Sequence, residues 1–223
     1  MKKVFIIGGA GNVGRSLAQQ LTRAGHQALA MYRHPEQEAP LKLLGATPVR
    51  GDLQSLDEQA LADLIAGSDV LVFSAGAGGK GGKEMTNAID GRGLEIAVAA
   101  AQKAGVSRFL LVSAFPEAGR GKAAPSDTFE NYTFENYMAV KKQADVHLAA
   151  SPLDWVILRP GTLTNDAGSG RINAGLAIPY GLIPREDVAT TLAALIDTPA
   201  VSRKIIEVTA GDTPALQAMQ ALA

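Results

Sequence analysis

Short runs of hydrophobic residues alternate with segments of helical periodicity along almost the whole chain. The runs are typical of buried strands, and apolar residues spaced three or four apart are typical of amphipathic helices. In the first helical segment Val13, Leu17 and Leu21 fall on one face. Strands are predicted at Val4–Ile7, Gln27–Tyr32, Thr47–Arg50, Asp69–Phe73, Phe109–Val112, Trp155–Leu158 and Lys204–Val208. Helices are predicted at Asn12–Ala24, Pro35–Leu44, Leu56–Ile65, Glu84–Ala104, Tyr132–Ala150 and Glu186–Ile196.

This alternation predicts an α/β fold with a doubly wound parallel sheet. Strands separated by helices pair in parallel through right-handed crossovers. The strands are almost purely apolar, as expected when helices cover both faces of the sheet. We therefore expect residues 1–223 to form a single domain, with residues 160–185 and the C-terminal tail making a substrate-side lobe.

Composition narrows the function classes. The formal net charge of −1 gives no electrostatic reason to expect nucleic acid or an anionic membrane as a partner. Cysteine is absent, which excludes disulfides, thiolate metal sites and a cysteine nucleophile, and the three histidines have no metal-ligand spacing. The apolar run after Lys2 and Lys3 is too short for a signal peptide. We expect a cytoplasmic protein that binds a small molecule and no metal.

The most informative motif follows the first predicted strand. Gly8, Gly11 and Gly14 have the spacing Gly-x-x-Gly-x-x-Gly, with Ala10 where the common dinucleotide-binding motif has its middle glycine. Such glycines allow a sharp turn, a close approach of backbone to pyrophosphate and tight packing of helix on sheet. The motif favours dinucleotide binding over an ordinary tight turn between strand and helix.

Two glycine-rich segments, Gly76–Gly82 and Gly119–Asp127, follow the carboxyl ends of strands. In a parallel sheet, ligands bind at these ends, so we expect both segments to be mobile and to border the ligand. The first segment does not match a phosphate-binding Walker A loop in either frame that ends at a lysine, Lys80 or Lys83. A kinase or ATPase is therefore not expected.

The residues after the second strand favour NADP(H) over NAD(H). NAD sites usually carry a carboxylate here that binds the ribose 2′-OH, whereas this chain has Arg33. A guanidinium suits a 2′-phosphate, although a solvated arginine is the alternative. Asp52, after the third strand, is interpreted either as a hydrogen-bond acceptor for the adenine amino group or as a turn residue.

A set of ordered motifs resembles a known family, the atypical short-chain dehydrogenase/reductases with an NAD(P)H-binding domain. This subgroup includes bacterial sugar-epimerase-like proteins, flavin-reductase-like proteins and the biliverdin reductase B type. The motifs are Gly8–Gly14, Arg33, Gly51–Leu53, Ser74–Gly76, Val112–Ser113, Arg159–Leu163 and Arg185–Ala189. The resemblance covers almost the whole chain and implies a Rossmann-type fold, but it says much less about the reaction.

The resemblance also implies which residues bind the cofactor. Asp52 and Leu53 are expected near adenine, Ser74–Gly76 near the ribose and Pro160–Leu163 near nicotinamide, while Arg185–Ala189 is expected to begin a helix of the C-terminal region. The full expected set is Gly8, Ala10, Gly11, Asn12, Val13, Gly14, Arg33, Asp52, Leu53, Ser74, Ala75, Gly76, Lys141, Pro160, Thr162 and Leu163.

Tyr137 and Lys141 form a Tyr-x-x-x-Lys motif, whose side chains share one face of a helix. The resemblance implies that Tyr137 is the general acid or base, that Lys141 binds the nicotinamide ribose and that Ser113 polarises the substrate oxygen. Two alternatives stay open. Such a pair also occurs on ordinary amphipathic helices, and the local repeat offers Tyr132 as a second candidate.

Three further residues have structural interpretations. We expect Arg159 to pair with Asp145 or Asp187, Trp155 to lie in the core, and Asp90 to be a helix-packing residue.

The sequence thus predicts an NADPH-dependent oxidoreductase that transfers hydride to a small carbonyl, quinone, flavin or tetrapyrrole-like acceptor. Two alternatives remain: a nucleotide-sugar epimerase or dehydratase with retained NAD(P), and a non-catalytic NADP(H)-binding redox sensor. Dimerisation is common on this fold, and nothing in the sequence decides whether this chain forms a homodimer.

Overall fold

The computed structural model describes residues 1–78, 81–115 and 129–223, with side chains omitted at 129–133. The main-sheet strands are β1 Lys3–Ile7, β2 Gln27–Tyr32, β3 Thr47–Arg50, β4 Val70–Phe73, β5 Arg108–Val112, β6 Asp154–Pro160, β8 Arg171–Gly175, β10 Lys204–Ala210 and β11 Thr213–Pro214. Within the described residues these strands form one nine-stranded sheet in the order β11-β8-β10-β6-β5-β4-β1-β2-β3. A separate pair, β7 Thr162–Thr164 and β9 Leu182–Pro184, lies beside it.

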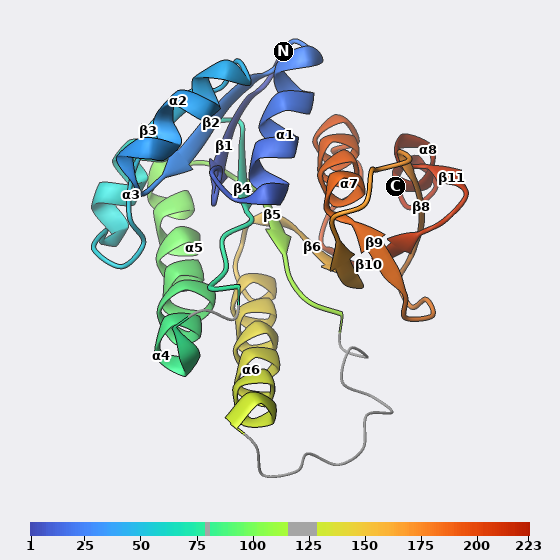
Figure 1. Ribbon diagram of the computed structural model, residues 1–223. Coiled ribbons are helices and arrows are strands. Elements are labelled where there is room, and N and C mark those ends of the chain that lie inside the picture. Colours follow the sequence, from blue (N-terminus) through green and yellow to red (C-terminus); the bar gives the residue numbers. More distant parts are fainter. Residues whose placement is uncertain (79–80, 116–128) are drawn as a thin grey trace.

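Helices flank both faces of this sheet (Figure 1). They are α1 Asn12–Arg23, α2 Glu38–Leu43, α3 Glu58–Ile65, α4 Gly82–Thr86, α5 Gly93–Ala104, α6 Phe129–Ala149, α7 Arg185–Asp197 and α8 Ala215–Gln220. A short 3₁₀ turn, Pro35–Gln37, precedes α2, and a π-helical segment, Asn87–Arg92, joins α4 to α5. None of the described helices is both long and apolar enough to cross a membrane.

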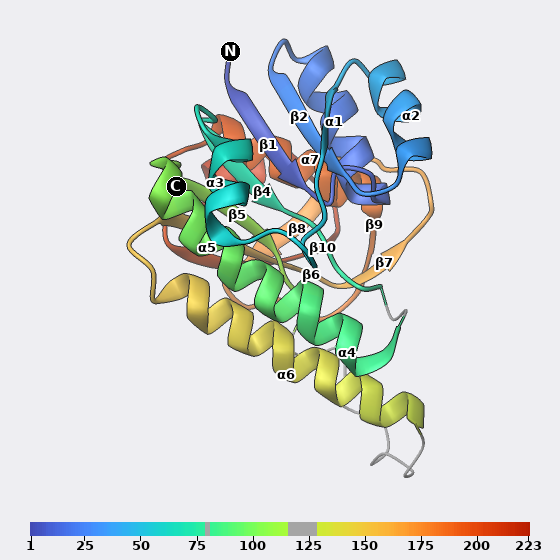
Figure 2. The same cartoon turned by 90° about the vertical axis from the view of Figure 1, so that its left-hand side faces the viewer.

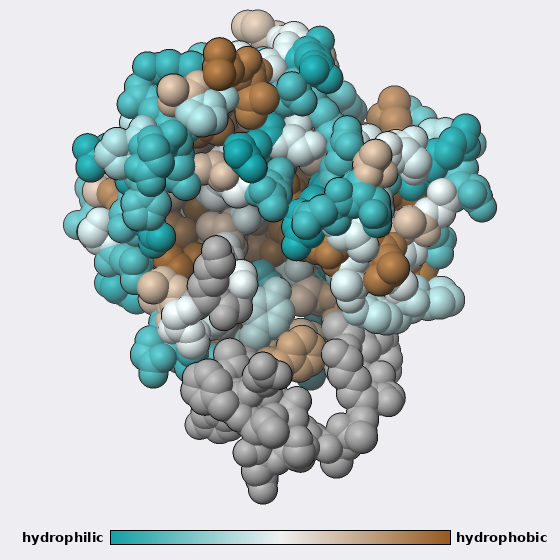
Figure 3. Space-filling model, in the orientation of Figure 1, coloured by the Kyte–Doolittle hydropathy of each residue, from teal (hydrophilic) through white to brown (hydrophobic). Residues whose placement is uncertain are grey.

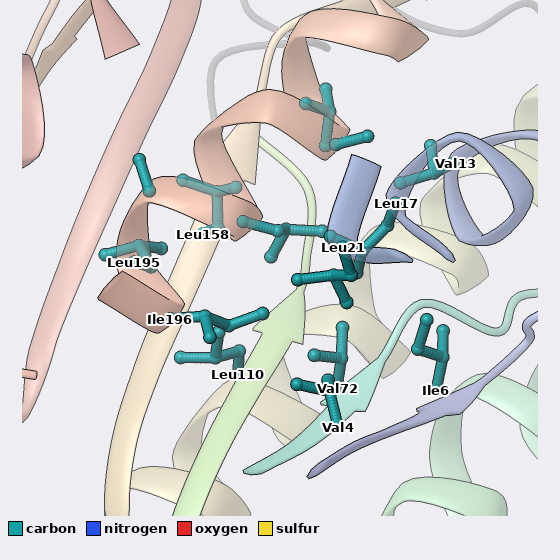
Figure 4. Close-up of a cluster of buried hydrophobic side chains, with 14 of the residues drawn as sticks. Val4, Ile6, Val13, Leu17, Leu21, Val72, Leu110, Leu158, Leu195 and Ile196 are labelled. Carbon is teal, nitrogen blue, oxygen red and sulfur yellow. The ribbon is translucent and has the colours of Figure 1, made fainter. Parts of the chain in front are cut away.

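The core lies in two layers, one on each face of the sheet. Alternate residues of a strand point to opposite faces, so each apolar strand contributes to both layers. Val4 and Ile6 of β1 pack under α1 and α7 with Leu17 and Leu195 (Figure 4). Phe5 and Ile7 of the same strand face the other way, toward α3, α5 and α6. There α5 and α6 run side by side (Figure 2).

The order of the strands creates a crevice at the carboxyl ends of β1 and β4. From β1 the chain runs outward through β2 and β3, then returns across the sheet to β4 on the other side of β1. The loops that follow β1 and β4 therefore leave in opposite directions, which is where doubly wound folds bind ligands. The sheet is parallel from β3 to β10, as predicted.

Every predicted strand and helix is present, with boundaries shifted by a few residues. Two predictions need correction: Glu84–Ala104 is interrupted by the π-helical segment, and Pro35–Leu44 starts as a 3₁₀ turn. The elements β7, β8, β9, β11 and α8 were not predicted. The strands among them are short and mostly solvent-facing, with only Ile172 buried in β8 and Ile183 in β9, so they contain no apolar run. At the sheet edge beyond β10, β8 pairs antiparallel with β10, and β11 pairs antiparallel with β8.

Candidate active site

The turn after β1 packs directly against the loop after β4. Gly8 has a positive φ of +84°, and a Cβ there would lie 2.6 Å from the backbone nitrogen of Ala75. A Cβ on Gly14 would lie 2.3 Å from the carbonyl oxygen of Gly8. Both contacts involve backbone, which cannot easily move away. Glycine at these positions therefore allows helix α1 to start close against the sheet edge.

The first turn of α1 has free backbone amides. Gly11 is its N-cap, and no side chain in the described part of the chain caps this turn. The turn also holds no acidic residue. The amides of Asn12, Val13 and Gly14 have no carbonyl partner within the helix, because the first such bond is from Arg15 to Gly11. Together with the helix dipole, these amides suit a phosphate group.

A first cavity, here called the β2-side cavity, opens from this turn toward the ends of β2 and β3 and has a volume of about 340 Å³. It is lined by Gly8, Ala10, Gly11, Met31, Tyr32, Arg33, Gln37, Gly51, Asp52, Leu53, Ser74, Ala75, Gly76, Ala77, Gly81, Met85 and Ile89. It therefore brings together most of the residues that the sequence assigned to adenine and ribose.

Arg33 is an exposed cation on the wall of the β2-side cavity. Its Nε donates to His34 Nε2 at 3.0 Å, and its Nη1 donates to Gln54 Oε1 at 3.4 Å. Neither acceptor is a carboxylate, and Arg33 forms no ion pair with the described carboxylates. Asp52 accepts the Gln54 amide at 3.0 Å, the geometry of a turn residue, while it also borders the cavity.

A second cavity, here called the α6-side cavity, has a volume of about 710 Å³. It is lined by Gly11, Asn12, Val13, Ser74, Ala75, Gly76, Gly78, Thr86, Asp90, Val112, Ser113, Phe134, Tyr137, Lys141, Leu163 and Arg185. The two cavities share Gly11 and Ser74–Gly76, so they form one groove over the carboxyl ends of the strands. Figure 3 shows hydrophobic side chains in the hollow middle of the molecule, between hydrophilic borders.

Tyr137 and Lys141 lie one turn apart on α6, and both line the α6-side cavity. Lys141 Nζ is 5.9 Å from the centroid of the Tyr137 ring. It donates to the Val112 carbonyl at 3.1 Å and to Asp90 Oδ1 at 3.3 Å. The lysine is therefore a fixed cation rather than a solvated surface residue.

Asp90, which we interpreted from sequence as a helix-packing residue, is part of this cavity. The side chains of Lys141 and Asp90 are only 7% and 1% exposed. The second carboxylate oxygen of Asp90 accepts the Ala77 amide at 3.0 Å. Asp90 thus joins α6 to the loop after β4. A charged residue among the apolar positions of a buried helix is the one signal in the sequence that could have identified it.

Ser113 follows β5 and borders the same cavity, almost fully buried. Behind it lies Asp145. Burial raises the pKa of the Asp145 carboxyl, and the Ser113 hydroxyl and the Arg159 guanidinium oppose this rise. The Ser113 hydroxyl is close enough to have this effect but makes no hydrogen bond of normal geometry with the described residues. The Ser113 hydroxyl is therefore a buried polar group at the wall of the cavity whose hydrogen bonding is unsatisfied among the described residues.

The ion pair predicted for Arg159 is confirmed with the first of its two candidate partners. Arg159 contacts Asp145 through Nη2 at 2.8 Å and Nε at 2.9 Å. Asp187 instead accepts the amides of Ser169 and Gly170. The core position of Trp155 is also confirmed, with 9% of the residue exposed.

Some expected site residues line neither cavity. Gly14 is buried beneath the turn, and Pro160 is buried at the end of β6. Thr162 is exposed, and its hydroxyl contacts that of Tyr180. Of the segment expected near nicotinamide, only Leu163 lines the groove. The segment Gly119–Asp127 and the side chain of Tyr132 lie outside the described residues.

Metal ligands are not gathered anywhere in residues 1–78, 81–115 and 129–223: no group of His, Asp and Glu there could hold a metal ion. The charged groups of the groove are instead Arg33, Asp52, Asp90, Lys141 and Arg185.

Comparison with known proteins gives consistent results. A family model described as NAD(P)H-binding matches residues 8–199. The Bacillus subtilis (strain 168) protein named uncharacterized sugar epimerase YhfK is 35% identical over 221 residues, or 99% of this chain and 100% of that protein. A Bacillus halodurans structure, provisionally named an NAD-dependent epimerase/dehydratase, has a TM-score of 0.87 at 31% identity and covers 100% of both chains. The oxidoreductase ylbE from Lactococcus lactis has a TM-score of 0.83 at 28% identity, covering 99% of this chain and 96% of its own.

Proposed function

This chain belongs to the NAD(P)H-binding family, and from that premise we propose that it is an NADPH-dependent oxidoreductase that transfers hydride to a small acceptor. The observation that carries the proposal is the continuous groove. At one end it has Arg33, a cation that forms no ion pair with the carboxylates the structure describes. The free amides of α1 lie in its middle, and Tyr137 lies at its other end beside the buried Lys141. This order of groups, cation, amides and then a polar chamber, is the one expected of a dinucleotide site with a reaction chamber.

The groups present fit a dinucleotide. The free amides of Asn12 and Val13 would hold the pyrophosphate. The adenosine half would lie in the β2-side cavity, with Arg33 at the 2′-phosphate and Leu53 beside adenine. The nicotinamide half would lie in the α6-side cavity beside Leu163. The preference for NADPH over NADH rests on Arg33 and on the lack of a carboxylate at the end of β2.

The α6-side cavity holds groups that can complete a hydride transfer to a carbonyl. NADPH, when bound, supplies the hydride. Tyr137 would donate the proton to the acceptor oxygen, and the hydroxyl of Ser113 would hydrogen-bond that oxygen. The nearby charge of Lys141 would stabilise the phenolate that is left. A quinone or flavin accepts hydride more readily and depends less on the tyrosine.

The direct test is consumption of NADPH with a panel of acceptors. The panel contains an aldehyde, a ketone, a quinone, a flavin and a linear tetrapyrrole, each measured with NADPH and with NADH by the absorbance of the reduced nicotinamide. We expect turnover with at least one class and a preference for NADPH. If calorimetry detects binding of neither dinucleotide, the proposal is wrong.

Replacing Tyr137 with phenylalanine is expected to lower kcat for a carbonyl acceptor by about 100-fold or more, the usual range for losing a general acid. Affinity for NADPH should hardly change, because the phenol oxygen is offered to the acceptor. Steady-state kinetics and calorimetry measure the two quantities. Tyr180→Phe is the matched control, since Tyr180 lines neither cavity. A variant Tyr137→Phe with the full rate would instead favour hydride transfer without a tyrosine proton.

Substitutions at two glycines of the turn should differ in how much they destabilise the fold. Gly14→Ala places a methyl group against backbone, which we expect to destabilise the fold by about 1–3 kcal/mol. Gly11→Ser adds a side chain at an extended N-cap, where serine is slightly better than glycine. Its Cβ would lie 3.2 Å from the Gly8 carbonyl oxygen, a tight contact that offsets this gain, so the stability of the cofactor-free protein should change by less than about 1 kcal/mol.

Both variants should bind NADPH more weakly. Gly14→Ala displaces the turn, whereas the Gly11→Ser hydroxyl competes for the same amides as the phosphate. Urea unfolding of the cofactor-free proteins and calorimetry with NADPH separate the two causes. A Gly11→Ser variant that binds NADPH as tightly as the wild type would contradict the placement of the pyrophosphate.

The names of the relatives favour a second candidate, a sugar-nucleotide epimerase that keeps its cofactor through the reaction. Such an enzyme should purify with bound dinucleotide and should interconvert a sugar nucleotide without net NADPH consumption. Release of the dinucleotide on denaturation of the freshly purified protein tests this alternative.

A further inference from the structure

The α6-side cavity has a second cation, Arg185, which the proposed hydride transfer does not use. Arg185 is the first residue of α7, and its side chain is partly buried. Its Nη1 donates to Asn165 Oδ1 at 2.8 Å and to the Leu163 carbonyl at 3.4 Å. Both partners are neutral. These two bonds hold the guanidinium through Nη1. Its other two nitrogens, Nε and Nη2, have no partner among the described residues.

The carboxylates nearest in sequence are already engaged elsewhere. Glu186 accepts the Gly168 amide at 2.9 Å. Asp187 accepts the Ser169 amide at 3.1 Å and the Gly170 amide at 2.7 Å. They hold the loop before β8, and neither forms an ion pair with Arg185 in the part of the chain that the structure describes.

The other charges among the described residues that line the α6-side cavity cancel. Lys141 and Asp90 form a buried pair with each other, so their net contribution is zero. The charge of Arg185 therefore makes the described lining of the cavity positive overall. Much of the remaining wall is apolar, with Val13, Val112 and Leu163 contributing to it. A cavity of this kind favours a ligand that has an apolar body and one anionic group.

We propose that Arg185 binds a carboxylate or phosphate group of the acceptor, so that the acceptor of the proposed reaction is an apolar molecule with an oxyanion. A guanidinium with one edge already fixed presents the rest of its donors in a set direction, which suits a planar oxyanion. The proposal rests on the proposed function, because it names the class of acceptor for the same site.

A second oxyanion could reach the same guanidinium. Asn12 and Val13 also line the α6-side cavity, and the proposed function places the pyrophosphate of the cofactor at their amides. The chemistry that Arg185 recognises is the same in both cases, so the experiment must separate the cofactor from the acceptor.

The test uses two probes of equal shape, naphthalene carboxylate and the neutral naphthalene carboxamide. Each is titrated by calorimetry into the NADP⁺-saturated protein and into the cofactor-free protein. We expect the wild type to bind the carboxylate about 10- to 100-fold more tightly than the amide, as for a hydrogen bond to a charged group. Arg185→Gln should remove this preference and leave the dissociation constant of NADP⁺ within about threefold of the wild type.

Two further variants make the comparison specific. Arg185→Lys keeps the charge but not the fork of donors, so it should keep only part of the preference. Arg15→Gln is the control, because it removes a nearby cation that lines neither cavity of the groove. Arg15 and Arg185 both line a separate surface pocket beside the groove. The only described side-chain hydrogen bond of Arg15 is to Asn12 Oδ1, so the preference should survive.

Two results would overturn the proposal. If Arg185→Gln weakens NADP⁺ binding about tenfold or more and the preference for the carboxylate survives, the anion is the pyrophosphate. If neither the preference for the carboxylate nor the dissociation constant of NADP⁺ changes, Arg185 has only a structural role, in binding Asn165 and the Leu163 carbonyl to α7. If the wild type binds no NADP⁺, the proposed function fails, and the titration of the cofactor-free protein still decides whether Arg185 selects an oxyanion.

Discussion

Replacing Arg33 with glutamate is expected to weaken NADPH binding by about 100-fold or more. The substitution removes charge-assisted hydrogen bonds to the 2′-phosphate and puts a negative charge in their place. NADH has a hydroxyl at this position, which can donate a hydrogen bond to the carboxylate, so the affinity for NADH should stay the same or improve. The preference between the two cofactors should therefore reverse. Calorimetric titration of both cofactors into both proteins measures the change.

Two controls make this result specific to the site. Arg33→Gln removes the cation without adding an anion, and its effect on NADPH should be intermediate. Arg50→Glu makes the same charge reversal at another exposed arginine, at the end of β3, which does not line the groove. It should change NADPH binding little, since a charge in solvent is screened. Equal losses in Arg50→Glu and Arg33→Glu would indicate a general field effect, and the assignment of NADPH to Arg33 would be wrong.

Replacing Asp90 with asparagine is expected to cost about 3–5 kcal/mol of unfolding free energy, the usual effect of leaving one member of a buried ion pair alone. The Lys141 ammonium would then stay buried with neutral acceptors only, the Val112 carbonyl and the amide oxygen of the new asparagine, and with no compensating charge from position 90. The link from α6 to the Ala77 amide would also weaken, so NADPH affinity should fall as well. Urea unfolding of the cofactor-free protein measures the first effect, and calorimetry the second.

A double substitution tests whether the loss comes from the charge. Asp90→Asn combined with Lys141→Met leaves no buried charge at these two positions, so it should be more stable than Asp90→Asn alone. Asp63→Asn on α3 is the control. Asp63 is exposed and accepts a hydrogen bond only from the Gln59 side chain among the described groups, so little stability should be lost. A loss below about 1 kcal/mol in Asp90→Asn would mean that the pair is effectively solvated.

The double variant also bears on chemistry. If it regains stability but not turnover, Lys141 and Asp90 contribute to the reaction as well as to the fold. This comparison is informative because Lys141 belongs to the Tyr-x-x-x-Lys motif and Asp90 does not, although the structure places their charged groups 3.3 Å apart.

Much of the fold was predictable because its signals are local. The apolar runs identified β1, β2, β4, β5, β6 and β10, since a strand buried on both faces needs no polar residue. The edge strand β3 was also predicted, although none of its residues is fully buried. The strands β7, β8, β9 and β11 were missed because they are short and half exposed, so they contain no apolar run that the sequence could show. The assignment of residues 160–185 and the C-terminal tail to a substrate-side lobe stays a prediction.

The candidate site was predictable to a smaller extent. The glycine turn, Arg33 and the shared face of Tyr137 and Lys141 follow from the local spacing of residues. Asp90 could not be placed, because the π-helical segment changes the phase of the helix around it, and each residue of an α-helix turns the side chain by about 100°. Arg185 was identified only as part of a motif that begins a helix.

By itself, the sequence determined the α/β fold, the turn that opens the first helix and the class of ligand, because hydrophobic periodicity and turn chemistry act over a few neighbouring residues. The tertiary structure determined which charged side chains contact one another and which face the cavity. It paired Asp90 with Lys141, placed Asp145 behind Ser113 and left Arg185 facing the cavity. These contacts join helices and loops far apart in the chain, and they depend on how each helix lies on the sheet, which no local pattern specifies.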